Sequence, residues 1–217
     1  MPSLKNILRE LRKELMDKEK ARETAQKDMR KATSLSKQGI LLIHQKRLQE
    51  AKKLIDDAKV IISKLRHDAT EYPETLYSGL YNAALQEFSE ANILLNLVEG
   101  LGFVTPEDID VPSVDYVLGL ADVIGEYRRL ALDALREGNV KKGEAHLKKM
   151  DEIYIELMAM DEAYMLVPGL RRKCDVARKI IETTRGDITQ EVRRESLEKH
   201  LRLFENLQRK AKTKRAD

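Results

Sequence analysis

The stretch from Asp115 to Asp133, DYVLGLADVIGEYRRLALD, constrains the fold more than any other part of the chain. Placed on a helix at about 100° per residue, it is apolar on most sides and keeps a single polar seam. The seam consists of Asp115, Asp122, Glu126, Arg129 and Asp133. A helix of this pattern needs other helices around it, with only a narrow acidic strip left open. The segment therefore predicts a buried central helix.

Two carboxylates of this seam, Asp122 and Glu126, are four residues apart and so lie next to each other on one face of the helix. Like charges at this spacing repel unless a cation or a proton lies between them. One interpretation is a cation site. The other is a solvated helix edge on which Glu126 pairs with Arg129, because such pairs are common on helices.

The composition predicts an all-α protein. Charged residues make up 35% of the 217 residues, aromatic residues only 5%, and there is no Trp. Long stretches rich in Ala, Glu, Lys, Leu and Arg with helical periodicity are typical of helical bundles. The length suits one sizeable hydrophobic core, so we expect a single domain over residues 1–217.

Charge and cysteine content restrict the class of protein further. The net charge of +3 is too small for a general polycation, so an anionic partner would need a local basic patch. A single cysteine, Cys174, cannot form an intramolecular disulfide and fits a reducing compartment. No apolar run approaches the roughly 18 residues of a membrane span. We expect a soluble, cytoplasmic protein without a membrane partner.

Apolar periodicity and chain breakers predict a bundle of about seven helices. Two long basic helices should occupy about 1–68, with a bend or break at Gly39 and an end at Tyr72-Pro73. The bundle should fill 74–207, with helices over 74–99, from Ser113 to Gly138-Asn139, and over 140–164, 170–184 and 188–207. Gly186 should separate the last two helices, and we expect a disordered basic tail at 208–217.

The predicted helix 74–99 carries two more carboxylates, Glu87 and Glu90, on the flank of its apolar stripe. Burying a carboxylate costs free energy unless a partner compensates its charge. Two carboxylates three residues apart therefore indicate either a cation site or a pair of boundary side chains that reach water.

The two N-terminal helices carry a set of basic residues interspersed with Ser and Thr. The set consists of Arg22, Lys27, Arg30, Lys31, Lys37, Lys46 and Arg47. A face of this kind can neutralise the phosphates of a nucleic acid. In a chain this rich in Lys and Glu, the alternative is an ordinary solvated face.

Several familiar sites are missing from the sequence. The histidines His44, His67, His146 and His200 are too widely separated for zinc spacing. No Glu-x-x-His motif for a di-iron bundle and no Gly-rich phosphate loop occurs. Cys174 is interpreted as a packed thiol.

Three segments together resemble the translin and TRAX family. They are LYSGLYNAALQEFSEA (76–91), DYVLGLADVIGEYRRLAL (115–132) and LRRKCDVARKIIETTRGDI (170–188), with a weaker likeness around SLSKQGILLIHQ. The resemblance implies an all-α subunit of about seven helices that assembles into a hollow octameric barrel. It also implies binding of single-stranded or duplex RNA, with single-stranded DNA as a further ligand.

The resemblance also assigns the acidic residues. The Glu-x-x-Glu pair of the TRAX-type site falls on Glu87 and Glu90, and its Asp-x-x-x-Glu pair falls on Asp122 and Glu126. Translin-type subunits, which only bind nucleic acid, do not keep all four. The resemblance therefore implies a TRAX-like subunit with catalytic potential.

Four carboxylates are suitable ligands for Mg²⁺ or Mn²⁺, because both ions prefer hard oxygen donors. Two such ions about 4 Å apart can activate a water molecule and stabilise the leaving oxygen of a phosphodiester. The expected function is thus a metal-dependent endoribonuclease that binds RNA inside a homo-octameric barrel. Two alternatives remain: a non-catalytic RNA- or DNA-binding protein of translin type, and a helical scaffold that binds only protein.

Overall fold

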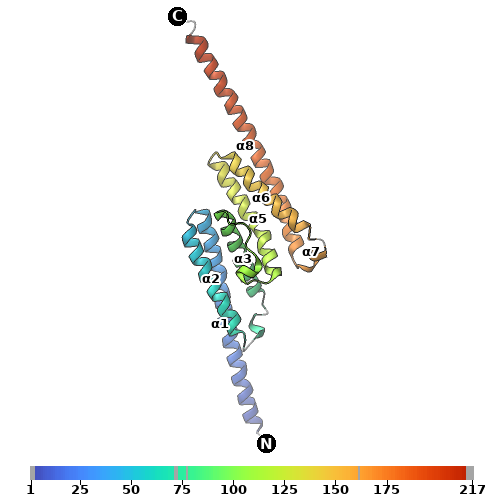
Figure 1. Cartoon of the computed structure of the whole chain (residues 1–217). Helices are drawn as coiled ribbons and strands as arrows, with labels where there is room; N and C mark the ends of the chain where they lie inside the picture. The colour runs from blue at the N-terminus through green and yellow to red at the C-terminus, as the bar shows by residue number, and fades with distance from the viewer. Residues whose placement is uncertain (1–2, 71–72, 77, 161, 214–217) are drawn as a thin grey trace. The chain divides into compact units, whose positions relative to one another are not determined.

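The structure is a computed structural model that describes residues 3–70, 73–76, 78–160 and 162–213 (Figure 1). Every regular element in these ranges is a helix, which confirms the all-α prediction. The chain packs as two compact units, Met1–Val123 and Ile124–Asp217, and the division falls inside one helix. Among the described helices, none combines the length and apolar character needed to cross a membrane.

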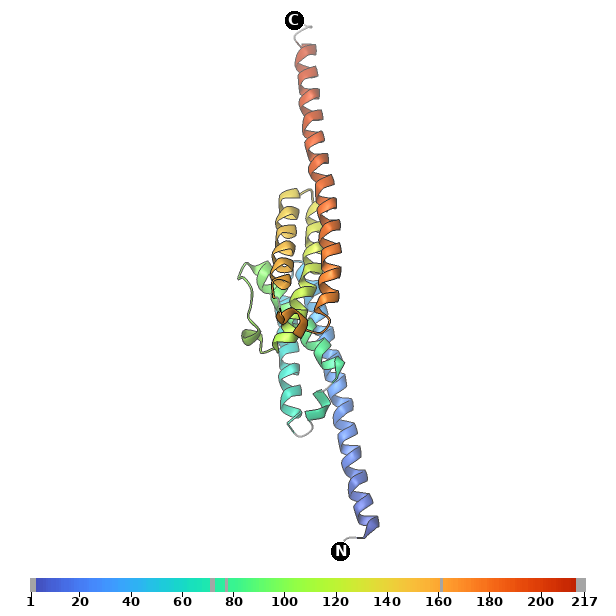
Figure 2. The same cartoon turned by 90° about the vertical axis from the view of Figure 1, so that its right-hand side faces the viewer.

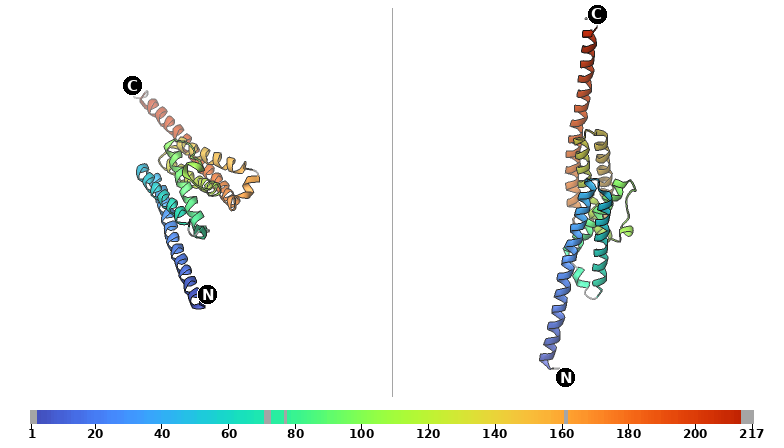
Figure 3. Two further views of the ribbon diagram at one scale, coloured as in Figure 1. Left: turned by 60° about the horizontal axis from the view of Figure 1, so that its bottom comes forward. Right: turned by 90° about the vertical axis from the view of Figure 1, so that its left-hand side faces the viewer.

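The first unit begins with two long helices, α1 (Leu4–His44) and α2 (Leu48–Asp68), which pack side by side (Figures 1 and 3). The side chain of Ser3 caps α1 by accepting a hydrogen bond from the backbone N–H of Asn6. The predicted break at Gly39 is wrong, because α1 continues through this residue and Gly39 is buried. A Cβ at Gly39 would lie 2.9 Å from Cγ1 of Ile55, so this glycine allows α1 and α2 to approach closely.

The chain turns instead at Lys46, whose φ of 61° is unusual for a residue other than glycine. The part of α1 that precedes the packed region extends beyond α2 and α3 (Figure 2). Its leucines remain exposed, for example Leu4 at 71% and Leu15 at 65%.

The predicted helix 74–99 is divided in the structure. A short 3₁₀-helix, η1 (Pro73–Leu76), precedes α3 (Gly79–Glu99), which is capped by Ser78 and ends at the left-handed Gly100. The short helix α4 (Pro106–Ile109) begins with a capping box between Thr105 and Asp108.

The core of the first unit includes the fully buried side chains of Met29, Ile43, Leu85, Phe88, Ile93 and Leu94.

The central helix α5 (Ser113–Arg136) begins and ends close to its predicted bounds. Asn139 caps α6 (Val140–Met158), which is shorter than predicted and is followed by the short α7 (Glu162–Leu166). In the second unit α6 packs against α8 (Figure 2). The core here includes Ile124, Met150, Ile153, Leu157, Leu170 and Ile181.

The two helices predicted for 170–184 and 188–207 form one continuous helix, α8 (Leu170–Thr213). The break predicted at Gly186 is therefore wrong, because a single glycine costs a helix only about 1 kcal/mol and the flanking residues favour helix. The helix also includes residues 208–213 of the expected tail, and residues 214–217 lie outside the described ranges.

Candidate nucleic-acid interface and acidic site

The acidic residues Glu87 and Glu90 lie one turn apart on α3. Glu90 is buried, with 7% of its surface exposed, and the Glu87 side chain is 24% exposed. Both therefore lie at the edge of the core of the first unit, as the sequence predicted. Burial of a carboxylate is costly, so the position of Glu90 is not that of an ordinary surface residue.

The contact between α3 and α5 depends on two small residues. A Cβ at Gly119 would lie 2.7 Å from both the Ser89 Cβ and the Gln86 carbonyl oxygen, and 3.0 Å from the backbone nitrogen of Glu90. Only glycine permits this approach, because real Cβ atoms do not come so close to other atoms. Asp122, which is half-buried, lies about one helical turn beyond this contact on the same helix.

Asp115, the first carboxylate of the predicted polar seam, connects α5 to α3 through hydrogen bonds. Asp115 is 2% exposed and accepts hydrogen bonds from the side-chain amides of Asn82, at 3.3 Å, and Gln86, at 3.2 Å. It lies in the first turn of α5, where the helix dipole favours a negative charge. Asp115 therefore has a structural role at the start of α5.

The fourth acidic residue, Glu126, belongs to the second unit and lies one turn beyond Asp122 along α5. It is half-buried. Among the described residues, no three His, Cys, Asp or Glu side chains come together closely enough to hold a metal ion. The donor chemistry of the four carboxylates suits Mg²⁺ or Mn²⁺, but the conformation in the structure is not an assembled metal centre.

A cation of the chain itself lies beside one of these carboxylates. Lys37 on α1 places its Nζ 3.1 Å from Oε1 of Glu87 on α3. The sequence predicted a role for each residue separately, in nucleic-acid binding and in metal binding. Nothing in the sequence indicated that they would be paired.

The seven basic residues predicted to bind nucleic acid are all exposed. Arg22 and Arg47 form ion pairs with Glu19 and Glu50. The hydrogen bond that Arg22 donates to Glu19 raises the pKa of Arg22, and the hydrogen bond that Glu50 accepts from Arg47 lowers the pKa of Glu50. Lys46 and Arg47 lie at the turn after α1, so they do not share a helix face with the others.

Three of the basic residues remain available to an anionic partner. Lys27, Arg30 and Lys31 are exposed on adjacent turns of α1, and none forms an ion pair with another described residue. Their spacing places them on one side of the helix, away from the buried Met29 and Ala32. This side of α1 is the strongest candidate for phosphate contacts.

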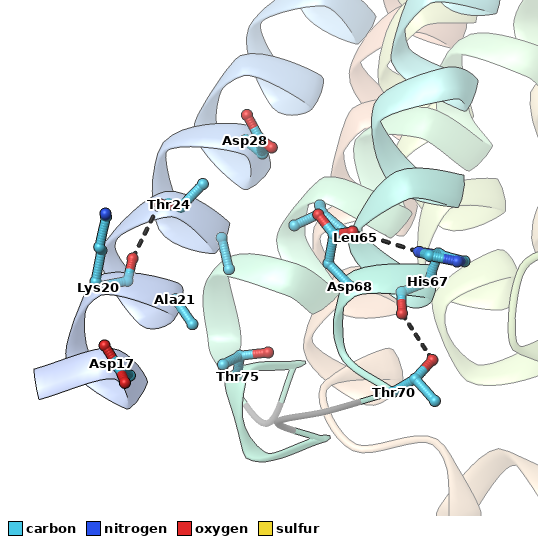
Figure 4. A pocket seen from close by; sticks show the side chains of 11 residues that line it. Asp17, Lys20, Ala21, Thr24, Asp28, Leu65, His67, Asp68, Thr70 and Thr75 are labelled. Carbon is cyan, nitrogen blue, oxygen red and sulfur yellow. Dashed lines mark hydrogen bonds and ion pairs between the residues drawn. The ribbon is translucent and has the colours of Figure 1, made fainter. Parts of the chain in front are cut away.

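A cavity of about 730 Å³, which no sequence pattern indicates, lies in the first unit between α1, the end of α2 and η1 (Figure 4). In its lining Asp28 pairs with Lys64 at 2.9 Å, and Asp68 lies 3.4 Å from Nδ1 of His67, whereas Asp17 and Lys20 form no ion pair with another described residue. The charges of Asp17 and Lys20 are opposite in sign, so the cavity does not present a cluster of like charge.

Two residues of the second unit are structural. Arg128, in the GE-x-RR part of the central segment, donates a hydrogen bond of 2.6 Å to Oγ1 of the buried Thr184. Cys174 is buried, and burial raises the pKa of its thiol. This confirms the interpretation of Cys174 as a packed thiol.

These features define an all-helical protein in which a basic helix packs against the helix that carries two of the four acidic residues. Residues 20–184 match the model of the translin family, and the chain belongs to this family. An uncharacterized protein of Methanocaldococcus jannaschii is 36% identical over 154 residues, which are 70% of this chain and 68% of that protein.

Solved structures agree with this assignment. The structure of AfC3PO in complex with duplex RNA is 37% identical and has a TM-score of 0.72, covering 85% of this chain and 95% of that chain. The crystal structure of apo-NeC3PO has a TM-score of 0.77 and covers 88% of this chain and 100% of that chain. At 21% identity, the second likeness shows the fold alone.

Proposed function

We propose that this protein is a metal-dependent endoribonuclease that binds RNA and hydrolyses its phosphodiester bonds at Glu87, Glu90, Asp122 and Glu126. The observation that supports the proposal is that α3 carries Glu87 and Glu90 and α5 carries Asp122 and Glu126, the four acidic positions that the resemblance to TRAX-type subunits implies. The 37% identity to AfC3PO, which was solved with duplex RNA, supports RNA as the ligand. A homo-octameric barrel, with RNA inside it, is the proposed assembly.

In this mechanism α1 positions the RNA. Lys27, Arg30 and Lys31 would contact successive phosphates, which neutralises charge and fixes the backbone without reading sequence. The close approach at Gly119 brings α5 against α3 in the first unit, next to the backbone of Glu90 and about one turn before Asp122. The chemistry that Mg²⁺ or Mn²⁺ supplies at such a site is activation of a water molecule and stabilisation of the leaving oxygen.

The test is cleavage of labelled RNA, both single-stranded and duplex, with Mn²⁺ and with a chelator. We expect cleavage only with the metal. Glu87→Gln and Asp122→Asn should each abolish cleavage without loss of RNA binding, because neither variant adds or removes bulk. Glu144→Gln, on the exposed surface of α6, is the matched control and should cleave like the wild type. Full activity in either site variant would refute the assignment.

A second candidate is an RNA- or DNA-binding protein without catalytic activity. It is favoured by the lack of an assembled three-ligand metal centre among the described residues and by the pairing of Glu87 with Lys37. For this candidate, RNA would remain intact at millimolar Mn²⁺ while the complex still formed. Native mass spectrometry of the same sample tests the octamer for both candidates.

A further inference from the structure

The ion pair between Lys37 and Glu87 connects two parts of the proposed machinery. Lys37 belongs to the helix that would contact RNA, and Glu87 belongs to the acidic set. The Lys37 side chain is 61% exposed, so its ammonium can also reach a ligand in solution. The Lys37 side chain thus contacts the Glu87 carboxylate and is exposed enough to contact a phosphate of RNA.

The neighbours of both residues in this ion pair are buried, while the lysine side chain itself is mostly exposed. Ser36, next to Lys37, is fully buried, as is Phe88, next to Glu87. A lysine side chain has four rotatable carbons and a compact charge, so it can exchange partners without movement of the helix. Any rearrangement at this site therefore needs only a change of rotamer.

We propose that Lys37 couples metal binding to RNA binding. Without metal its ammonium holds the Glu87 carboxylate, and when a divalent cation takes that carboxylate, Lys37 turns to a phosphate of the RNA. This inference rests on the proposed function, because it assumes that Glu87 is a metal ligand and that α1 contacts RNA. The inference adds that Lys37 links metal binding to RNA binding.

The physical reason is competition between like charges. An ammonium and a divalent cation repel each other, so they do not share one carboxylate without cost. Binding of the metal therefore releases Lys37, and binding of a phosphate to Lys37 exposes Glu87 to the metal. By thermodynamic reciprocity each ligand then raises the affinity of the protein for the other by the same factor.

The first experiment measures Mn²⁺ affinity by calorimetry on the full chain without RNA. Lys37→Ala is compared with Lys31→Ala, which removes the same charge from the same helix but forms no ion pair with a described residue. We expect Lys37→Ala to bind Mn²⁺ about two- to fivefold more tightly than Lys31→Ala, the range of an exposed ion pair.

The second experiment measures RNA affinity by fluorescence anisotropy in the presence of a chelator. Glu87→Gln releases Lys37 and should raise RNA affinity about two- to fivefold. In the Lys37→Ala background the same Glu87→Gln change should have a smaller effect, since the lysine that it would release is gone. This double-mutant cycle isolates the pair from the general change in charge.

The outcomes separate the inference from the proposed function. If Mn²⁺ binds and depends on Glu90 and Asp122, but Lys37→Ala and Lys31→Ala have equal Mn²⁺ affinity and the cycle shows no coupling, the inference is wrong and the metal site stands. If no variant binds Mn²⁺, both the inference and the proposed catalysis are overturned. Thermal melting of each variant shows whether the fold is retained.

Discussion

Gly119 of α5 lies so close to Ser89 of α3 that an added Cβ would stand 2.7 Å from the Ser89 Cβ. The same Cβ would be 2.7 Å from the carbonyl oxygen of Gln86, a backbone atom that cannot rotate away. We predict that Gly119→Ala lowers the free energy of unfolding by about 1–3 kcal/mol, the usual cost of overpacking. Urea unfolding followed by circular dichroism measures this.

The control for Gly119→Ala is Gly125→Ala in the same helix. A Cβ at Gly125 would meet no other described atom within 4 Å. Alanine favours helix over glycine by about 0.8–1.0 kcal/mol, so Gly125→Ala should stabilise the protein or leave it unchanged. Equal destabilisation by both variants would show that the close approach of Gly119 to α3 does not cause the loss of stability.

The buried carboxylate of Asp115 provides a second prediction. Asp115→Ala removes the acceptor for the Asn82 and Gln86 amides and should cost about 1–3 kcal/mol, because buried donors lose their partner. Asp115→Asn should cost less, since its carbonyl oxygen can still accept these bonds. Denaturant unfolding of the two variants gives the comparison, and an equal loss would contradict a role based on hydrogen bonding.

Helical periodicity was sufficient to predict the all-α fold and the bounds of α5, but it misjudged glycine. Glycine as a helix breaker predicts interruptions at Gly39 and Gly186, but both residues lie inside continuous helices. The sequence does not show whether a glycine ends a helix or permits a close contact, as at Gly39 against Ile55. The actual turn falls at Lys46, a residue type without turn preference.

The candidate site can be proposed from residue types in the sequence, but the contacts of its residues cannot. The spacing of Glu87 and Glu90 indicated that both lie on one flank of a helix, and the structure buries Glu90. The partner of Glu87 could not be predicted, because Lys37 is distant in sequence and meets it only through the packing of α1 on α3. The apolar periodicity of one sequence contains no information about ion pairs between residues on different helices.

A third prediction concerns pH and His146 of α6. Its Nε2 is buried without a hydrogen-bond partner among the described residues, and its ring packs edge-on against Tyr127 with centroids 5.6 Å apart. Burial, and then the charge of Lys142, lowers the pKa of His146 from its ordinary value. The unfolded chain therefore binds a proton at higher pH than the folded chain does.

It follows that His146 destabilises the fold as pH falls below its ordinary pKa of about 6.5, and has no such effect well above it. We predict that His146→Phe flattens the dependence of unfolding free energy on pH across this window. Tyr127→Phe is the control and should keep the slope, because burial raises the pKa of Tyr127 to about 12, far from this range. A slope unchanged in His146→Phe would assign the effect to other groups.

The last prediction concerns the exposed basic side of α1. Lys27, Arg30 and Lys31 form no ion pair with a described residue, so they are available to phosphates. Each phosphate contact releases condensed counterions, and the logarithm of affinity falls linearly with the logarithm of salt concentration. Replacing all three residues with Ala should therefore flatten this slope by about one unit for each phosphate contact that is lost.

The matched control replaces Arg9, Arg12 and Lys13 with Ala. These residues are also exposed on α1 and carry the same total charge, but they precede residue 20, where the match to the translin family begins. If RNA lies along the packed part of α1, only the first triple variant changes the slope, and the melting temperature of both variants stays close to that of the wild type. An equal change in both would mean that net charge alone, rather than a defined face, sets the affinity for RNA.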